Sequence, residues 1–330
     1  MLFFAFKLSY NDCTKLLKPQ AAGLPACTFT VKERKMMKNP YAGIYTALLT
    51  PFDRQDRINE KELEKLVKYN LKMGVTGFYV GGSTAEAFLL SIEERKQIFE
   101  IVKSAAPDST LIAHIGALRE SDALLLGMHA AELGYSLISS VAPFYYKFSF
   151  PEIRDYYFRL ADGVGLPMLV YHFPAFSGVQ FGLSEMKTFL ADDRFAGIKY
   201  TSNDFFMMEQ CKSAFPDKVV FNGFDEMFLC GLSMGADGGI GSTYNFMADK
   251  FVRMQKLMQE GNLEQAKEIQ KEANAIIAVL CRIGVMSAEK EVLNQLGFDF
   301  GVCRHPFKEP DAEEKELIRK NILPHINDLR

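Results

Sequence analysis

Short apolar runs alternate with longer amphipathic stretches from Tyr41 onward, and this alternation organises most of the chain. Short runs rich in apolar and β-branched residues predict buried strands, whereas apolar residues that recur at helical spacing predict helices. The apolar runs predict eight strands, over residues 44–49, 77–80, 110–115, 136–141, 168–171, 195–201, 219–222 and 238–241.

Amphipathic stretches between these runs predict a helix after most of the strands. Asn59 and Glu62 resemble a capping box that opens the first helix, which Gly74 ends. The apolar stripe of this helix consists of Leu63, Leu66, Val67 and Leu71. A similar capping pattern, at Ser91 and Glu94, opens the second helix. Further helices are predicted over 121–133, 151–161, 184–190, 204–215, 226–233 and 244–259.

The number and order of these elements predict a (β/α)8 TIM barrel, because eight βα units over roughly 250 residues are typical of that fold. The competing fold, a doubly wound open sheet, needs a glycine-rich turn after its first strand. The first strand here is followed instead by Thr50-Pro51-Phe52. Helical stretches over 263–283, 287–296 and 312–329 then predict a C-terminal helical extension. We therefore expect a poorly ordered segment at 1–37, a barrel at 38–260 and the extension at 261–330.

Composition narrows the class of protein. The chain has 330 residues, of which 48% are hydrophobic, and a formal net charge of −3. Its charges are mixed and form no basic block, which argues against nucleic-acid binding. No apolar run is long enough to cross a bilayer, and the first 37 residues lack the features of a secretory signal. The six cysteines and five histidines show no disulfide or metal-ligand spacing, so we expect a cytoplasmic protein with reduced thiols and no metal site.

Lys199 occupies an unusual position within the predicted strand 195–201. Side chains alternate between the faces of a strand, which places Lys199 opposite the apolar positions Ala196, Ile198 and Tyr200. Burying an unpaired charge is costly, so an inward lysine is best explained as a neutral amine. A neutral amine can attack a carbonyl carbon, which makes Lys199 the candidate nucleophile.

Other candidate functional groups follow the remaining strands. In a TIM barrel the active site lies at the C-terminal ends of the strands. These ends carry hydroxyls, glycines, the lysine and a pair of acids, at Thr50, 81–86, Tyr145, Tyr146, Tyr171, 199–201, 223–226 and 241–243. This set suits a small, polyhydroxylated, anionic substrate that carries a carbonyl group.

Three of these groups have a specific interpretation beside an ordinary structural one. The turn from Gly81 to Thr84 can bind an anion through backbone N–H groups, or it can be an ordinary strand–helix turn. Because it has no basic residue, a carboxylate fits it better than a polyphosphate. Tyr171 shares the inward parity of Lys199 and is either a proton relay or a core tyrosine. Asp225 and Glu226 are either ligands of substrate hydroxyls or charges that favour a helix N-terminus.

Six segments together carry a resemblance to a known family: 81–88, 143–146, 171–178, 197–202, 222–228 and 235–245. From Tyr41 onward the chain resembles the N-acetylneuraminate lyase and dihydrodipicolinate synthase family of TIM barrels, and most closely its sialic acid-cleaving branch. The resemblance implies a class I aldolase that cleaves N-acetylneuraminate to N-acetylmannosamine and pyruvate through a Schiff base. It implies no metal or organic cofactor, because the imine acts as the electron sink.

The resemblance also implies residue roles. Lys199 would form the Schiff base, and Tyr171 would move the proton. The substrate carboxylate would be held by Ser83 and Thr84. Further substrate-binding roles are implied for Thr201, Gly223, Asp225, Glu226 and Ser242. Tyr145 resembles a family tyrosine that reaches into a neighbouring subunit's site, which implies a homotetramer.

Three positions bear on substrate choice. Phe176 argues against the dihydrodipicolinate synthase branch, in which an arginine at this position grips a second carboxylate. Ala85 and His172 depart from the family pattern, where glycine and asparagine are usual, and His172 is predicted to face the helices. Two alternative functions stay open: an aldolase or dehydratase acting on a 2-keto-3-deoxy sugar acid, and a catalytically silent ligand-binding barrel.

Overall fold

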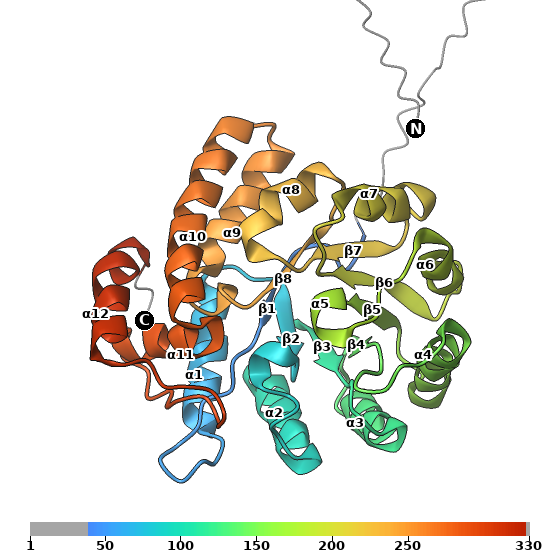
Figure 1. The fold of residues 1–330 in the computed structure, drawn as a ribbon, viewed down its shortest axis with the longest axis horizontal. Helices are drawn as coiled ribbons and strands as arrows, with labels where there is room; N and C mark the ends of the chain where they lie inside the picture. Colours follow the sequence, from blue (N-terminus) through green and yellow to red (C-terminus); the bar gives the residue numbers. More distant parts are fainter. Residues whose placement is uncertain (1–38, 328–330) are drawn as a thin grey trace, which may run out of the picture. The chain divides into compact units, whose positions relative to one another are not determined.

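Eight parallel strands close into a barrel in the computed structural model, which describes residues 39–327 (Figure 1). Each strand pairs with its neighbour in the sequence, and the last pairs with the first through Tyr45 and Ile240. The strands are β1 (Ile44–Ala47), β2 (Gly77–Val80), β3 (Thr110–His114), β4 (Leu137–Val141), β5 (Met168–His172), β6 (Phe195–Tyr200), β7 (Val219–Asn222) and β8 (Gly238–Gly241). This topology confirms the predicted TIM barrel and excludes the open doubly wound sheet.

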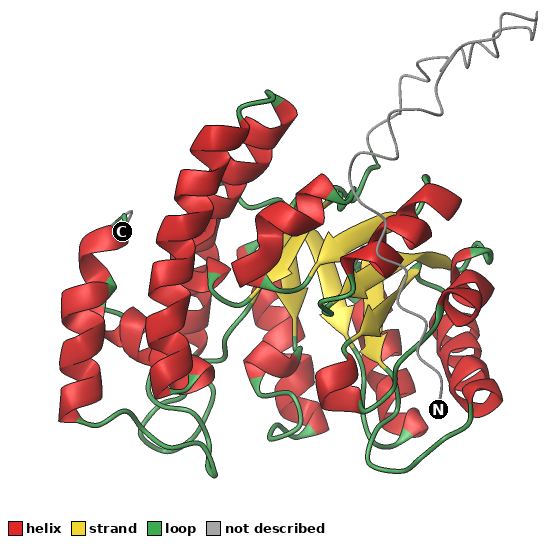
Figure 2. Cartoon of the chain, turned by 45° about the horizontal axis from the view of Figure 1, so that its top comes forward, coloured by secondary structure: helices red, strands yellow, loops and turns green. Residues whose placement is uncertain are grey.

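Helices surround the strands, and further helices follow the barrel in the sequence (Figure 2). The barrel helices are α1 (Glu60–Lys72), α2 (Ile92–Ala105), α3 (Glu120–Glu132), α4 (Phe150–Val164), α5 (Pro174–Ser177), α6 (Leu183–Leu190), α7 (Phe205–Ala214), α8 (Phe228–Ser233) and α9 (Tyr244–Gln259). Single 3-10 turns lie at η2 (Ser83–Ala85), η3 (Asp225–Met227) and η4 (Leu323–His325). The C-terminal helices are α10 (Leu263–Ile283), α11 (Val285–Gln295) and α12 (Ala312–Asn321).

The strands are buried on both faces, which explains their nearly continuous apolar sequences. One hydrophobic cluster fills the barrel interior, and a larger one lies between the strands and the surrounding helices. The interior cluster consists of Tyr45, Ala47, Tyr79, Ile112, Leu137, Val141, Leu169, Tyr171, Val219, Phe221 and Ile240. The interior is therefore a packed core, and its layer nearest the C-terminal ends of the strands supports the candidate site.

The starts of the first two barrel helices differ from each other. At α2 the predicted capping box is confirmed, because Ser91 and Glu94 bond each other's backbone N–H groups. At α1 it is wrong, because Glu62 instead accepts a hydrogen bond from the backbone N–H of Asp299, at 3.0 Å. Leu71, expected on the buried stripe of α1, is 37% exposed. Sequence pattern alone cannot reveal such competition from a residue more than two hundred positions away.

The start of β6 departs from regular alternation. Two consecutive residues of β5 pair with Phe195 and Gly197, which lie two positions apart, so Ala196 is an extra residue in a β-bulge. Ala196 packs against the barrel interior, and the prediction that it shares the outer face with Ile198 is wrong because the bulge resets the alternation. Beyond the bulge the alternation resumes, and Lys199 faces inward as predicted.

The C-terminal helices pack on the barrel rather than standing apart from it, and the described residues 39–327 form one compact unit. α10 lies along α9, and α11 contacts both α9 and α10. The helix expected over 312–329 ends at Asn321 and is followed by η4. The expectation for residues 1–37 lies outside the described residues. Within 39–327, no helix is long and apolar enough to cross a membrane.

Candidate active site

A cavity of about 350 Å³ lies at the C-terminal ends of the barrel strands. Nine of the ten residues singled out from the sequence line it: Ser83, Thr84, Tyr171, Lys199, Thr201, Gly223, Asp225, Glu226 and Ser242. Tyr171 lies on β5 and Lys199 on β6, and the others lie in the segments that follow β2, β6, β7 and β8. The closed barrel therefore gathers side chains that are up to 159 positions apart in the sequence around one small volume.

Lys199 lies at the centre of this arrangement and is only 4% exposed. Its Nζ lies 4.0 Å from the centroid of the Tyr79 ring and 4.1 Å from the centroid of the Tyr171 ring. Burial lowers the pKa of Lys199 to about 7, against the opposing effect of the Asp225 carboxylate. A large fraction of the lysine is therefore a neutral amine at neutral pH, as a nucleophile requires.

Tyr171 is held beside the lysine by the register of the sheet, because it pairs directly with Lys199 across β5 and β6. Burial raises the pKa of Tyr171 well above its usual value, while hydrogen bonding with Ser83 and Thr201 acts in the opposite direction. The phenol therefore keeps its proton near neutral pH, and the hydroxyls of Ser83 and Thr201 line the same cavity. Such a group can donate a proton and recover it through its partners.

The turn after β2 carries Ser83 and Thr84 into the cavity. It is a single 3-10 turn that ends at Glu86, whose φ of 60° is in the left-handed region. Gly82 is needed before it, because a Cβ there would lie 2.6 Å from the ring of Tyr79. Because Gly82 lies so close to Tyr79, the turn carries the hydroxyls of Ser83 and Thr84 past the ring that contacts Lys199. The turn thus has the hydroxyl groups that a carboxylate ligand can accept from.

The opposite side of the cavity carries the acidic pair. Asp225 Oδ2 accepts hydrogen bonds from the backbone N–H and the hydroxyl of Thr243, at 2.9 and 2.7 Å. Its Oδ1 is buried without a hydrogen-bond partner among residues 39–327. Burial raises the pKa of Asp225 to about 6, so it is mainly ionised at neutral pH. Gly241 makes room for this carboxylate, since a Cβ there would lie 1.9 Å from Oδ1.

Sequence reasoning missed several contributors to the site: Tyr79, Glu289 and the residues of α10 and α11 that line the cavity, Ile277, Cys281, Val285 and Met286. Tyr79 could have been predicted, because strand alternation in 77–80 points its side chain inward, where its ring contacts Lys199. Glu289 had no usable signal. It lies on α11, and its Oε1 accepts a hydrogen bond of 2.7 Å from the Ser242 hydroxyl only because α11 packs over the end of β8.

Tyr145 is the one singled-out residue that does not line the cavity. It is 83% exposed, with a φ of 79°, and its ring contacts Tyr146 in an edge-to-face arrangement. A second depression of the surface contains Tyr145, Tyr146 and Phe148. Within one chain Tyr145 is therefore not a partner of Lys199, and its role stays a prediction.

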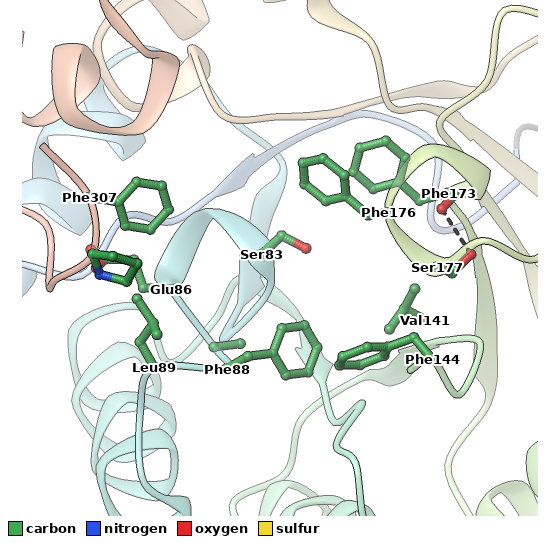
Figure 3. Close-up of a pocket in the computed structure, with 12 residues that line it drawn as sticks. Ser83, Glu86, Phe88, Leu89, Val141, Phe144, Phe173, Phe176, Ser177 and Phe307 are labelled. Atoms are coloured by element: carbon green, nitrogen blue, oxygen red, sulfur yellow. Dashed lines mark hydrogen bonds between the residues drawn. The ribbon is translucent and has the colours of Figure 1, made fainter. Parts of the chain in front are cut away.

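An apolar chamber of about 400 Å³ adjoins the cavity and shares Ser83, Phe173, Phe176 and Phe307 with it (Figure 3). In Figure 3 the rings of Phe173 and Phe176 lie side by side, and Ser83 lies between this pair and Phe307. Their centroids are 4.3 Å apart, and Phe176 is 70% exposed. Phe176 therefore presents an uncharged ring to both cavities, and such a ring cannot pair with a second carboxylate.

His172 faces away from the cavity, as strand alternation predicts. Its ring stacks on Phe181 and lies 5.1 Å from the ring of Tyr200, on the helix side of the barrel. Burial lowers the pKa of His172 to about 4, so the ring is neutral under ordinary conditions. The departure from the family pattern at this position therefore changes the packing behind β5 rather than the surface of the cavity.

The fold and this site define a TIM barrel with a neutral lysine at the C-terminal ends of its strands. Comparison with known proteins then identifies the family: the Dihydrodipicolinate synthetase family matches residues 40–324, and the chain belongs to it. The chain is 43% identical over 283 residues to an N-acetylneuraminate lyase from Rhizobium meliloti (strain 1021), covering 86% of this chain and 94% of the relative.

Solved structures agree with this assignment. CdNal from Clostridium difficile, in complex with mannosamine, superimposes with a TM-score of 0.83 and 37% identity, over 85% of this chain and 99% of that one. N-Acetylneuraminate lyase from Fusobacterium nucleatum, complexed with pyruvate, superimposes with a TM-score of 0.81 and 39% identity, over 85% and 97% of the two chains. The resemblance inferred from sequence segments is therefore confirmed at the level of family and fold.

Proposed function

We propose that this chain is a Schiff-base aldolase that cleaves N-acetylneuraminate to N-acetylmannosamine and pyruvate. The observation that carries the proposal is Lys199, an inward lysine with a pKa lowered to about 7, positioned against Tyr171. The similarity to N-acetylneuraminate lyases over most of both chains supports the choice of substrate. The acidic pair and Ser242 on the far side of the cavity suit the hydroxyl-rich end of such a sugar acid.

The reaction begins with imine formation. The neutral amine of Lys199 attacks the C2 ketone of the open-chain substrate, and water leaves to give a protonated imine. Ser83 and Thr84 hold the adjacent carboxylate through their hydroxyls. The positive imine nitrogen then withdraws electrons from the neighbouring bonds, so no other electron sink is required for the next step.

Bond cleavage follows when the C4 hydroxyl loses its proton. Tyr171, with the substrate carboxylate, relays this proton, and the C3–C4 bonding electrons pass into the imine to form an enamine. N-Acetylmannosamine leaves as the aldehyde product. The enamine takes up a proton at C3, and water hydrolyses the resulting imine to release pyruvate and the free Lys199 amine.

Borohydride trapping tests the proposed nucleophile. Borohydride reduces an imine to a stable amine, so the protein incubated with pyruvate and borohydride is expected to gain one covalent adduct, located by peptide mass spectrometry at Lys199. Lys199→Met should gain none and should not cleave N-acetylneuraminate. Lys187→Met, a substitution on α6 outside the cavity, is the matched control and should trap normally. Normal cleavage by Lys199→Met would overturn the mechanism.

A substrate panel tests the proposed specificity. Purified protein is compared on N-acetylneuraminate, its N-glycolyl form and 2-keto-3-deoxygluconate at matched concentrations. We expect the highest kcat/KM on a sialic acid. Faster turnover of the deoxy sugar acid would assign the chain to a different aldolase or dehydratase, and absence of any reducible pyruvate adduct would favour a ligand-binding barrel.

We further propose that the protein is a homotetramer in which Tyr145 of one subunit reaches the site of a neighbour. The exposure of Tyr145, Tyr146 and Phe148 supports this, because exposed aromatic clusters are typical of interaction surfaces. Mixing tests it: if Tyr145 acts across the interface, inactive Lys199→Met and impaired Tyr145→Ala subunits should regain activity when combined and reassembled. Sedimentation gives the subunit number, and a monomer with full activity would exclude the proposal.

Domain organisation and location complete the proposal. We assign catalysis to the barrel of residues 38–260 and a supporting role to the helices of 261–330. We place the protein in the cytoplasm, because Cys211, Cys230, Cys281 and Cys303 are free thiols, which persist in reducing compartments. Fractionation of the source cells tests this location.

A further inference from the structure

Glu289 is an acid that the proposed reaction does not use, although it stands directly behind the cavity. It lies on α11 and is completely buried. Its Oε1 accepts the hydrogen bond from Ser242 Oγ, at 2.7 Å, and Ser242 lines the cavity. Its Oε2 has no hydrogen-bond partner among the described residues. Burying an acid costs free energy when one of its two oxygens has no hydrogen-bond partner, so the presence of Glu289 here calls for an explanation.

A hydroxyl group has one proton to donate and two lone pairs to accept with. Because the proton of Ser242 is committed to Glu289, only its lone pairs remain available to the cavity. The neighbouring Asp225 also lines the cavity, and its carboxylate, with a buried and unpartnered Oδ1, can likewise only accept when it is ionised. This wall of the cavity therefore selects ligand groups that donate, as sugar hydroxyls do, and disfavours carbonyl or carboxylate oxygens.

We infer that Glu289 is a positioning residue that fixes Ser242 as a hydrogen-bond acceptor for a hydroxyl of the sugar. This inference deepens the proposed function and rests on it. Glu289 does not itself line the cavity, so it acts on sugar binding through Ser242 and has no part in the reaction at Lys199.

The charge state of Glu289 decides which substitution preserves this role. Burial raises the pKa of Glu289 to about 8, with the hydrogen bond from Ser242 acting in the opposite direction and the nearby Asp225 carboxylate adding a smaller upward effect. The group is therefore mainly a neutral carboxylic acid at neutral pH, and because Oε1 accepts from Ser242 the acid proton belongs on Oε2. Glutamine is similar in shape and keeps a carbonyl oxygen that accepts from Ser242, whereas leucine fills the space but accepts nothing.

Steady-state kinetics of the condensation of pyruvate with N-acetylmannosamine provide the test. Glu289→Leu should raise KM for the sugar about fivefold, the effect of weakening one hydrogen bond, and leave KM for pyruvate unchanged. Glu289→Gln should stay close to wild type at pH 7. Glu291→Gln, on the same helix but facing Lys315 and Gln295, is the matched control and should leave both KM values unchanged.

A double-mutant cycle separates positioning from a structural role. If Glu289 acts through Ser242, Ser242→Ala combined with Glu289→Leu should be no worse than Ser242→Ala alone. Additive effects, equal increases in both KM values, or an unchanged sugar KM for Glu289→Leu would overturn the inference. Urea unfolding checks the fold, and Glu289→Met serves as the second variant if Glu289→Leu does not fold.

The outcome also distinguishes this inference from the proposed function. If the wild-type protein does not condense the two compounds, the proposed function fails, and the same variants are compared on the aldehyde that the substrate panel identifies. If the wild type condenses them and Glu289→Leu matches it, only the inference about Glu289 fails.

Discussion

Nζ of Lys290 lies 2.6 Å from Oε1 of Glu86, and both side chains are almost completely buried. Glu86 ends the turn that presents Ser83 and Thr84, while Lys290 belongs to α11. The second oxygen of Glu86 accepts a hydrogen bond from the backbone N–H of Arg304, at 2.8 Å. The C-terminal helices are therefore tied to the turn that carries Ser83 and Thr84 by a buried ion pair, so they support the site as well as covering the barrel.

Lys290→Met should destabilise the protein by about 3–5 kcal/mol, because it leaves the Glu86 carboxylate buried without its partner. Urea unfolding followed by circular dichroism measures this. The double variant Lys290→Met with Glu86→Gln should recover part of the loss, since it removes the unpaired charge. Lys315→Met is the control: Lys315 is 37% exposed and pairs with the exposed Glu309, so its loss should cost about 1 kcal/mol or less. Equal losses for Lys290 and Lys315 would contradict the prediction.

Asp225→Asn should shift the pH dependence of imine formation to lower pH. The neutral fraction of Lys199 rises with pH through its pKa of about 7, so the rate of pyruvate trapping should rise over that range and then level off. The Asp225 carboxylate raises the pKa of Lys199, and its removal should lower the midpoint by about one pH unit. The measurement is the rate at which borohydride traps the adduct, followed from about pH 5 to about pH 9. This range brackets the titration of Lys199.

Glu226→Gln is the matched comparison for Asp225→Asn. Glu226 lines the same cavity, but unlike Asp225 it is not among the groups that raise the pKa of Lys199. We therefore expect a weaker affinity for the sugar and an unshifted midpoint for pyruvate trapping. A shift of the same size in both variants would show that the midpoint does not report the Asp225 charge.

Tyr171→Phe should separate imine formation from bond cleavage. It removes only the hydroxyl, so the kcat for cleavage should fall about 100- to 10,000-fold, as expected for loss of a general acid–base group. Pyruvate should still form a reducible adduct at Lys199. The control is Tyr45→Phe, another tyrosine of the barrel interior, whose hydroxyl bonds the backbone carbonyl of Tyr41 outside the cavity. Loss of trapping in Tyr171→Phe would assign Tyr171 to imine formation instead.

The sequence was sufficient for the fold and for most of the polar side chains that line the cavity, and the reason is geometric. Closing the barrel brings every strand's C-terminal end to one rim, so strand order and alternation already place Tyr171 and Lys199 together. The same reasoning fails at Ala196, where one extra residue in β6 reverses the facing of a side chain. Alternation is reliable only where the ladder is regular, and the bulge has no distinctive sequence pattern beyond a glycine.

Groups supplied by the C-terminal helices were not predictable in the same way. Glu289 and Lys290 are adjacent in the sequence, yet one contacts Ser242 after β8 and the other contacts Glu86 after β2. Neither contact follows from helical periodicity, which would only interpret two charged residues on a helix as exposed. Their burial depends on how α11 packs across the rim, and such packing is set by tertiary contacts rather than by local pattern.

Gly197→Ala should disrupt β6 and with it the placement of Lys199. A Cβ at Gly197 would lie 1.8 Å from the backbone carbonyl oxygen of Val219 on β7, and neither strand can yield without breaking the ladder between them. We expect a loss of stability of at least about 3 kcal/mol and a low yield of folded protein. Gly182→Ala, where a Cβ would meet nothing closer than 3.6 Å, should change stability by less than about 1 kcal/mol. If Gly197→Ala unfolds in urea like the wild type, the close approach of β6 and β7 at the bulge does not constrain this residue.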